Sequence, residues 1–124
     1  MAILGSGLNI MYPPENRDLA RQIVASGTLI SEVHPDTNVT PSALRLRNRL
    51  ITAFSCATIV IEAGATSGAL HAARFAGQQG HPVFAAANSD GNVALLEHGA
   101  AHPLPDDPAD VDALIDQIRQ FAPP

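Results

Sequence analysis

The chain has 124 residues, of which 46% are hydrophobic and 15% charged, a composition that indicates one packed globular domain and excludes a disordered chain. Its formal net charge of −5 and pI near 5.3 exclude bulk electrostatic attraction of nucleic acid or of an anionic membrane, so any anion site must be local. With one cysteine, no signal-peptide pattern and no segment near the ~20 apolar residues of a membrane helix, we expect a cytoplasmic protein without a disulfide framework and without a membrane partner.

The first half of the chain alternates short apolar runs with segments of helical period. Pro14 is tolerated in the first turn of a helix, and Gly27 is a natural stop for that helix. Ser42 is interpreted as the cap of a second helix. In chain order the pattern predicts a strand, a helix, a strand, a loop and a helix, over residues 2–4, 13–26, 28–32, 33–41 and 42–55.

The second half opens on the clearest strand. Residues 57–61 are mostly apolar and β-branched and lead to Glu62, which predicts a strand over residues 57–62 that is apolar on both faces. The neighbouring Cys56 is interpreted as a small buried side chain rather than a reactive thiol. The pattern then predicts a turn, a helix closed by Gly80, a strand, a loop, a short helix and an edge strand, over residues 64–68, 69–79, 82–86, 88–91, 92–98 and 101–104.

The tail predicts an amphipathic helix. Asp107 is a candidate N-cap, and Val111, Leu114, Ile115 and Ile118 form one apolar stripe. Strands that alternate with helices predict an α/β fold, a Rossmann-like three-layer sandwich with a mostly parallel sheet and helices on both faces. We expect residues 1–104 to form this domain and the helix of residues 105–124 to pack on it.

Three features fall at the expected carboxyl edge of such a sheet, where ligands bind. A Gly5-Ser6-Gly7 turn follows the first strand, and Thr66-Ser67-Gly68 opens the helix after the strand of residues 57–62. The free N–H groups and hydroxyls of a helix start can hold a phosphate, although an ordinary capped turn has the same residues.

The third feature is a group of three arginines in a chain of seven arginines and no lysine. Arg45 and Arg49 are one helical turn apart and share a face, whereas Arg47 points roughly the opposite way and could cap a neighbour or pair with an acid. A planar guanidinium binds phosphate bidentately, so the group is either a phosphate clamp or a solvated helix face.

No catalytic set is evident. The five histidines have no metal-ligand spacing, and Glu62 has no obvious acid–base partner. We therefore expect no enzyme activity, no metal and no cofactor.

With these residues in view, the chain resembles the DNA-processing protein A family (DprA, also called Smf). The resemblance extends from Ala2 to about Ala101 and follows the order of the family's motifs. The matching segments are Ile3-Leu4-Gly5-Ser6-Gly7-Leu8-Asn9, Tyr12-Pro13-Pro14-Glu15-Asn16, Leu29-Ile30-Ser31-Glu32, Arg47-Asn48-Arg49-Leu50-Ile51, Ile59-Val60-Ile61-Glu62-Ala63, Thr66-Ser67-Gly68-Ala69-Leu70 and Gln79-Gly80-His81-Pro82-Val83-Phe84-Ala85.

The resemblance implies a Rossmann-like domain that binds single-stranded DNA through its phosphates, acts in transformation and recombination with a RecA recombinase, and forms homodimers. It implies no catalysis. Carried onto this chain, the positions expected near phosphate are Gly5, Ser6, Gly7, Arg45, Arg47, Asn48, Arg49, Thr66, Ser67 and Gly68. The first strand would be interior in the family's sheet, so we expect a homodimer that hides its edge.

The chain also departs from the family. The N-terminal strand and turn that members usually carry are missing from this sequence, so we expect a truncated Rossmann-like domain. Ala86-Ala87 replaces the usual Pro-Gly. Two alternatives therefore stay open: a nucleotide-binding enzyme like the phosphoribohydrolases of the same superfamily, with a nucleotide phosphate as its ligand, or a degenerate partner domain.

Overall fold

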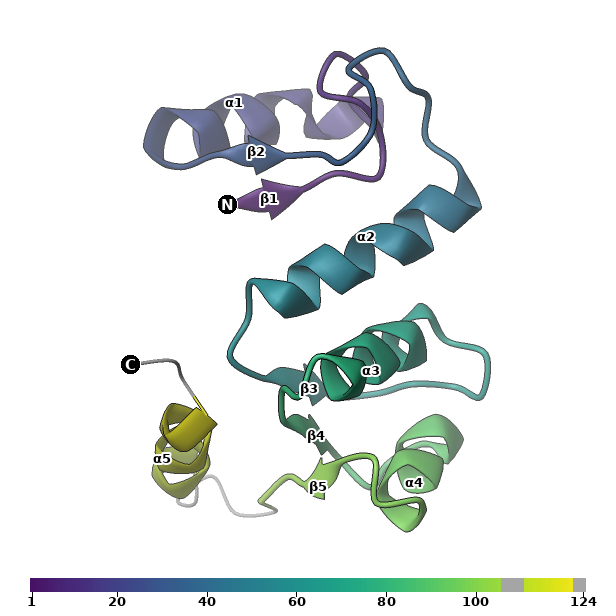
Figure 1. The fold of residues 1–124 in the computed structure, drawn as a ribbon, viewed down its shortest axis with the longest axis vertical. Coiled ribbons are helices and arrows are strands. Elements are labelled where there is room, and N and C mark those ends of the chain that lie inside the picture. The colour runs from purple at the N-terminus through teal and green to yellow at the C-terminus, as the bar shows by residue number, and fades with distance from the viewer. Residues whose placement is uncertain (106–110, 122–124) are drawn as a thin grey trace. The chain divides into compact units, whose positions relative to one another are not determined.

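The computed structural model describes residues 1–105 and 111–121, in which helices alternate with short parallel strands (Figure 1). This arrangement confirms the predicted α/β class. The chain divides into two compact units, Met1–Leu50 and Ile51–Pro124. The division falls within the helix that carries the arginines. The predicted boundary at residue 104 stays a prediction.

The first unit is built on a pair of parallel strands, β1 (Ala2–Ile3) and β2 (Leu29–Ile30), with Ala2 opposite Leu29. The predicted helix of residues 13–26 consists of a 3₁₀ turn, η1 (Pro14–Asn16), that leads into α1 (Arg17–Ser26). Ile3 and Ala20 are buried in the core of this unit. The crossover from β1 through α1 to β2 is the connection that parallel strands require.

The helix α2 (Pro41–Ala53) begins one residue before the predicted cap, so the assignment of Ser42 as that cap is wrong. Thr40 caps the helix instead: its hydroxyl accepts a hydrogen bond of 3.1 Å from the N–H of Ala43. Pro41 then takes the first helical position, where a missing N–H costs nothing because that group would have no partner within the helix.

The second unit contains a parallel sheet of order β3-β4-β5, formed by Thr58–Val60, Val83–Ala85 and His102–Pro103. The connecting helices are α3 (Gly68–Gln78) and α4 (Asp90–Glu97). Both helices pack into one apolar cluster with the strands, made mainly of alanine and valine: Val60, Ala63, Ala73, Ala76, Val83 and Ala85. The predicted edge position of residues 101–104 is confirmed, since β5 ends the sheet.

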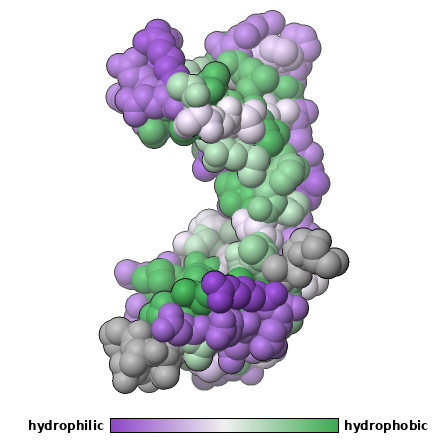
Figure 2. Space-filling model, turned by 90° about the vertical axis from the view of Figure 1, so that its left-hand side faces the viewer, coloured by the Kyte–Doolittle hydropathy of each residue, from purple (hydrophilic) through white to green (hydrophobic). Residues whose placement is uncertain are grey.

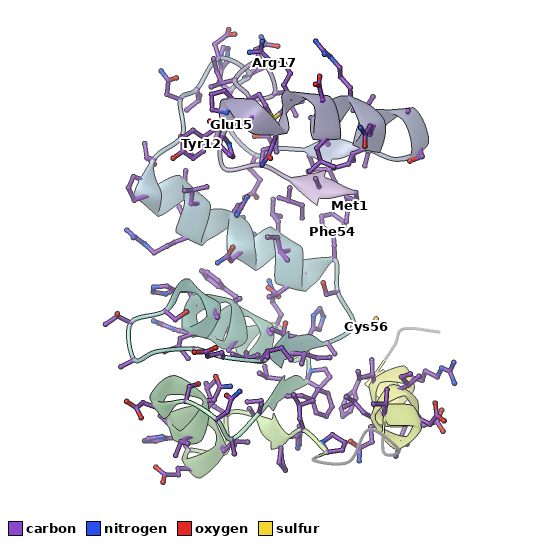
Figure 3. The ribbon with its side chains drawn as sticks, turned by 180° about the vertical axis from the view of Figure 1, so that it is seen from behind. Met1, Tyr12, Glu15, Arg17, Phe54 and Cys56 are labelled. Atoms are coloured by element: carbon purple, nitrogen blue, oxygen red, sulfur yellow. The ribbon has the colours of Figure 1, made fainter. Side chains whose placement is uncertain are left out.

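The segment around β3 is more exposed than its apolar sequence indicates. The strand is not buried on both faces: Val60 is 3% exposed, whereas Ile59 is 45% and Ile61 64% exposed. The reason is that the cluster formed with α3 and α4 covers the Val60 face of the strand. Cys56 is also exposed, in the segment between α2 and β3 where Figure 3 labels it, so its interpretation as a buried side chain is wrong.

The C-terminal helix α5 spans Val111–Phe121. Of the predicted apolar stripe, Leu114 is buried, whereas Val111 and Ile115 are exposed. The predicted cap at Asp107 lies outside the described residues, and the packing of residues 105–124 on the domain stays a prediction. In residues 1–105 and 111–121, no helix combines the length and the apolar character that crossing a membrane demands.

Candidate functional site

The Gly5-Ser6-Gly7 turn after β1 is buried and closely packed. A Cβ atom on Gly5 would lie 2.9 Å from Cδ2 of Leu44 and 3.2 Å from its backbone, so glycine lets α2 approach β1. On Gly7 a Cβ atom would lie 2.1 Å from the carbonyl oxygen of Pro35. Packing alone therefore requires both glycines.

The polar groups of this turn already have partners within the chain. The Ser6 hydroxyl donates to the carbonyl of Ile10 at 2.6 Å, and the Gly7 N–H donates to the carbonyl of Thr37 at 2.9 Å. The Ser6 carbonyl accepts from the hydroxyl of Ser31 at 2.8 Å. A phosphate would have to compete with these bonds, so the expected role of Gly5, Ser6 and Gly7 in phosphate binding stays a prediction.

The arginine group lies on α2, next to the turn, because Gly5 contacts Leu44. Arg47 is half-buried, and one of its terminal nitrogens donates to the carbonyl of Ile3 in β1 at 3.3 Å. Its Nε atom is buried and has no hydrogen-bond partner in the part of the chain that the structure describes. Arg47 therefore caps a backbone carbonyl of the neighbouring strand, one of the two roles predicted for it. Its expected role in phosphate binding stays a prediction.

The other members of the group differ in whether they could bind an anion without breaking an existing contact. Arg49 forms an ion pair with Glu32, and both side chains are 45% exposed. Asn48 is half-buried and engaged within the chain. Arg45 is exposed and has neither an ion pair nor a side-chain hydrogen bond to any described residue. An exposed guanidinium without an ion pair can bind an anion without losing an existing contact, so Arg45 is the best placed of the three arginines.

The predicted helix start Thr66-Ser67-Gly68 forms in the second unit. Ser67 caps α3, and its hydroxyl accepts from the N–H of Ala69 at 3.2 Å. Thr66 is exposed, and the space where a Cβ atom of Gly68 would lie is open. The Gly5 turn and the arginines lie close together in the first unit, whereas Ser67 lies in the second unit. A common phosphate site of the arginines and Ser67 stays a prediction.

The loop between β3 and α3 is held by residues that the sequence pattern did not indicate. Asn92 is fully buried, and its Nδ2 atom lies 3.0 Å from the carbonyl oxygens of Val60 and Ile61 and 2.8 Å from that of Ala86. It therefore ties together the carboxyl ends of β3 and β4.

The residues before Asn92 continue this connection. The Ser89 hydroxyl accepts from the N–H of Ala63 at 3.0 Å, and the Gly91 N–H donates to the carbonyl of Ala63 at 2.9 Å. A Cβ atom on Gly91 would lie 2.5 Å from that same oxygen. In the sequence, residues 89–92 are a run of residues typical of turns. The one signal for a close approach of two backbone segments there is Gly91, because only glycine leaves room where a Cβ atom would lie.

Comparisons with known proteins agree on one family. Residues 1–119 match the family described as DNA recombination-mediator protein A. The chain is similar to the Smf protein of Synechocystis sp., with 38% identity over 106 residues, 81% of this chain and 27% of the relative. It is also similar to the Smf protein of Escherichia coli, with 38% identity over 107 residues, 81% of this chain and 29% of the relative. The chain thus spans less than a third of the length of these relatives.

Two solved structures are similar as well. One is a DNA processing protein A from Helicobacter pylori, described for its unique single-stranded DNA binding mode. It has a TM-score of 0.78 and 28% identity over 93% of this chain and 55% of its own. The other is DprA from Streptococcus pneumoniae, with a TM-score of 0.74 and 31% identity over 90% of this chain and 41% of its own.

Proposed function

Because the chain belongs to the DNA recombination-mediator protein A family, we propose that it binds single-stranded DNA through the backbone phosphates. The observation that carries this proposal is the similarity, over 93% of the chain, to the Helicobacter pylori protein and its single-stranded DNA binding mode. Within this chain, Arg45 is exposed and has no ion pair with a described residue, which supports a contact to phosphate.

The proposed contacts follow the availability of the side chains. Arg45 binds phosphate directly, and Arg49 binds it in exchange for Glu32, an exchange that costs little because exposed ion pairs are weak. Arg47 holds α2 against β1 and positions the other two arginines. The hydroxyl of Thr66 and the capped start of α3 are proposed as a second place where phosphate binds, since a helix N-terminus attracts anions.

A titration of a labelled single-stranded oligonucleotide, followed by fluorescence anisotropy, tests the proposal. Arg45→Ala should weaken binding about tenfold or more, since a charge-assisted hydrogen bond contributes about 1.5 kcal/mol at the lower end of its range. Arg17→Ala is the matched control, because it removes the same charge from another exposed arginine of the same unit. Equal affinities for the parent and both variants would contradict a site at Arg45.

The same titration separates the proposal from the enzyme alternative. Mononucleotides should compete poorly with the oligonucleotide, because one phosphate cannot occupy several contacts at once. Tight binding and turnover of a nucleoside monophosphate would instead favour a phosphoribohydrolase-like activity. Delivery of the bound strand to a RecA recombinase and assembly as a homodimer complete the proposal and rest on the family.

A further inference from the structure

A pocket of about 450 Å³ lies between α1, the loop that follows β1 and the first residue of β2. All of its lining residues fall between positions 8 and 29, so the first unit forms the pocket without any residue of the second. Sites for small organic molecules have volumes of about 300–1,000 Å³. The pocket is therefore large enough for a ligand of this kind.

One wall of the pocket is a single face of α1. Arg17, Ala20, Arg21 and Val24 have the spacing i, i+3, i+4 and i+7 of residues that share a helix face. Ala20 is 8% exposed and lies in the core of the unit, whereas Val24 is 57% exposed. The face thus offers two guanidinium groups beside an exposed apolar side chain.

Another wall is the loop of residues 8–11, which is held by bonds within the unit. The N–H of Asn9 donates to the carbonyl of Pro35 at 2.9 Å. The side-chain amide of Asn9 donates to the carboxylate of Asp36 at 2.7 Å. These bonds fix the wall before a ligand arrives, which lowers the entropy cost of binding.

The charged side chains that line the pocket have one sign. They are Arg17 and Arg21, and both are exposed. Arg17, labelled in Figure 3, has neither an ion pair nor a side-chain hydrogen bond to any described residue. Arg21 pairs with Asp18 at 2.7 Å, but the two side chains are 73% and 83% exposed, so an anion can replace the carboxylate at little cost. Charge complementarity therefore favours an anionic ligand.

The rest of the lining is mainly apolar and partly exposed. Leu8 is 48% exposed, and Met11 and Leu29 are half-buried. Figure 2 shows the same mixture on the first unit, where hydrophilic and apolar side chains lie side by side at the surface. An apolar ligand body removes such side chains from water, which favours binding. The phosphates through which DNA binding is proposed have no such body.

We propose that this pocket binds a small amphiphilic anion, an organic molecule whose apolar body carries one acidic group such as a carboxylate. The apolar body lies against Leu8 and Val24. The acidic group pairs with Arg17 and Arg21, because a planar guanidinium binds carboxylates bidentately.

The site is separate from the one proposed for DNA. Its lining residues come from outside α2, the helix that carries Arg45, so Arg17→Ala remains a suitable control for DNA binding. The inference goes beyond the DNA-binding proposal and does not depend on it. Each of the two can fail while the other holds.

The first experiment compares two fluorescent probes with the same ring system. 8-Anilinonaphthalene-1-sulfonate carries an acidic group, and N-phenyl-1-naphthylamine is its uncharged counterpart. The sulfonate should bind at least about tenfold more tightly, and Arg17→Gln and Arg21→Gln should each weaken it about fivefold without changing the affinity of the uncharged probe. Equal affinities of the parent for both probes, or no effect of either substitution, overturns the proposal.

Arg119→Gln is the matched control for Arg21→Gln. Arg119 pairs with Asp116 at 3.0 Å over the same spacing along a helix and is 73% exposed like Arg21, but it lies on α5 and outside the pocket. Its variant should bind both probes like the parent. A loss equal to that of Arg21→Gln would mean that the sulfonate responds only to the net charge of the chain, which overturns the proposal.

The second experiment removes part of the apolar wall. Val24→Ser should weaken both probes by about threefold or more, because contacts with the wall do not depend on charge. Leu46→Ser is the control, since Leu46 has the same exposed fraction of 57% and lies outside the pocket. Equal effects of the two variants overturn the proposal. A thymidine oligonucleotide should leave the bound sulfonate in place, and displacement would overturn the assignment of a separate site.

Discussion

At the residue scale, Asn92 decides the geometry at the end of the second sheet. Its amide is the one polar group that reaches β3, β4 and the loop after them at once among the contacts of the described residues. Its Oδ1 atom is buried without a hydrogen-bond partner there. The contribution of this side chain therefore lies in its N–H donors, because the three carbonyl groups that it contacts would otherwise lose a hydrogen-bond donor.

Asn92→Leu should lower the free energy of unfolding by about 2 kcal/mol or more. The substitution leaves the carbonyls of Ile61 and Ala86 without this donor, and each buried unsatisfied group costs about 1–3 kcal/mol. Urea denaturation measures the change. Asn88→Ala is the control, since Asn88 is exposed and accepts only one long bond of 3.3 Å. Equal losses in the two variants would mean that the connection contributes little.

Asn92→Asp adds a pH dependence to the same measurement. Burial and the facing carbonyl oxygens would raise the pKa of the introduced carboxyl above its ordinary value of about 3.9. A raised pKa in the folded state destabilises the ionised form, so this variant should lose stability relative to Asn92→Leu as the pH rises above about 4. A constant difference between pH 3 and 7 would show that the carboxyl is solvated.

At the scale of elements, α2 carries both the arginines and the contact to β1, so the position of its first turn matters. Thr40 supplies the cap, Pro41 the first helical residue, and Leu44 the contact to Gly5. If the sequence moved by one residue along the helix while the helix stayed in place, every side chain would turn by about 100°. The N-cap thus helps to set the direction in which Arg45 points.

Thr40→Ala should destabilise the protein by about 1 kcal/mol, because the N–H of Ala43 loses its acceptor. Ser42→Ala should change stability by less than about 0.5 kcal/mol, because Ser42 already lies inside the helix. Thermal denaturation of the two variants compares them directly. A larger loss for Ser42→Ala would restore Ser42 as the cap.

At the scale of the whole molecule, the chain is acidic, so its proposed DNA binding relies on a few arginines. For single strands, the slope of log K against log salt is about −0.7 for each phosphate neutralised. Three arginines on α2 then predict a slope no steeper than about −2, and Arg45→Ala should reduce it by about 0.7. Titrations between low and physiological salt measure this slope, and a much steeper one would place other cations at the interface.

The same titrations should show little preference for base identity. The chain has one tyrosine and four phenylalanines, and none lies between the arginines as a stacking surface would require. Oligonucleotides of different sequence should therefore bind within a few-fold of one another at equal salt. A strong preference for one base would indicate base contacts that the proposal does not contain.

Features that depend on residues close together in the sequence could be predicted, and features that depend on distant residues could not. The strands around Ile3, Leu29, Ile59 and Phe84 and the helices between them follow from apolar period and from glycine and proline at their ends. The exposure of Ile59 could not be predicted in this way, because an apolar strand looks the same whether a second layer covers it or not. The partners of Arg47 and Arg49 were equally out of reach, since Ile3 and Glu32 are distant in sequence.

The sequence by itself determined the order and type of the elements, the parallel α/β class and the family resemblance, because these depend on residues near one another in the chain. Only the tertiary structure decided which glycines are needed for packing and which arginine is available to an anion. Those properties depend on what each group meets across long sequence separations. Burial and hydrogen bonding are set by the neighbours that folding brings together, so the same arginine can hold a strand at position 47 and face solvent at position 45.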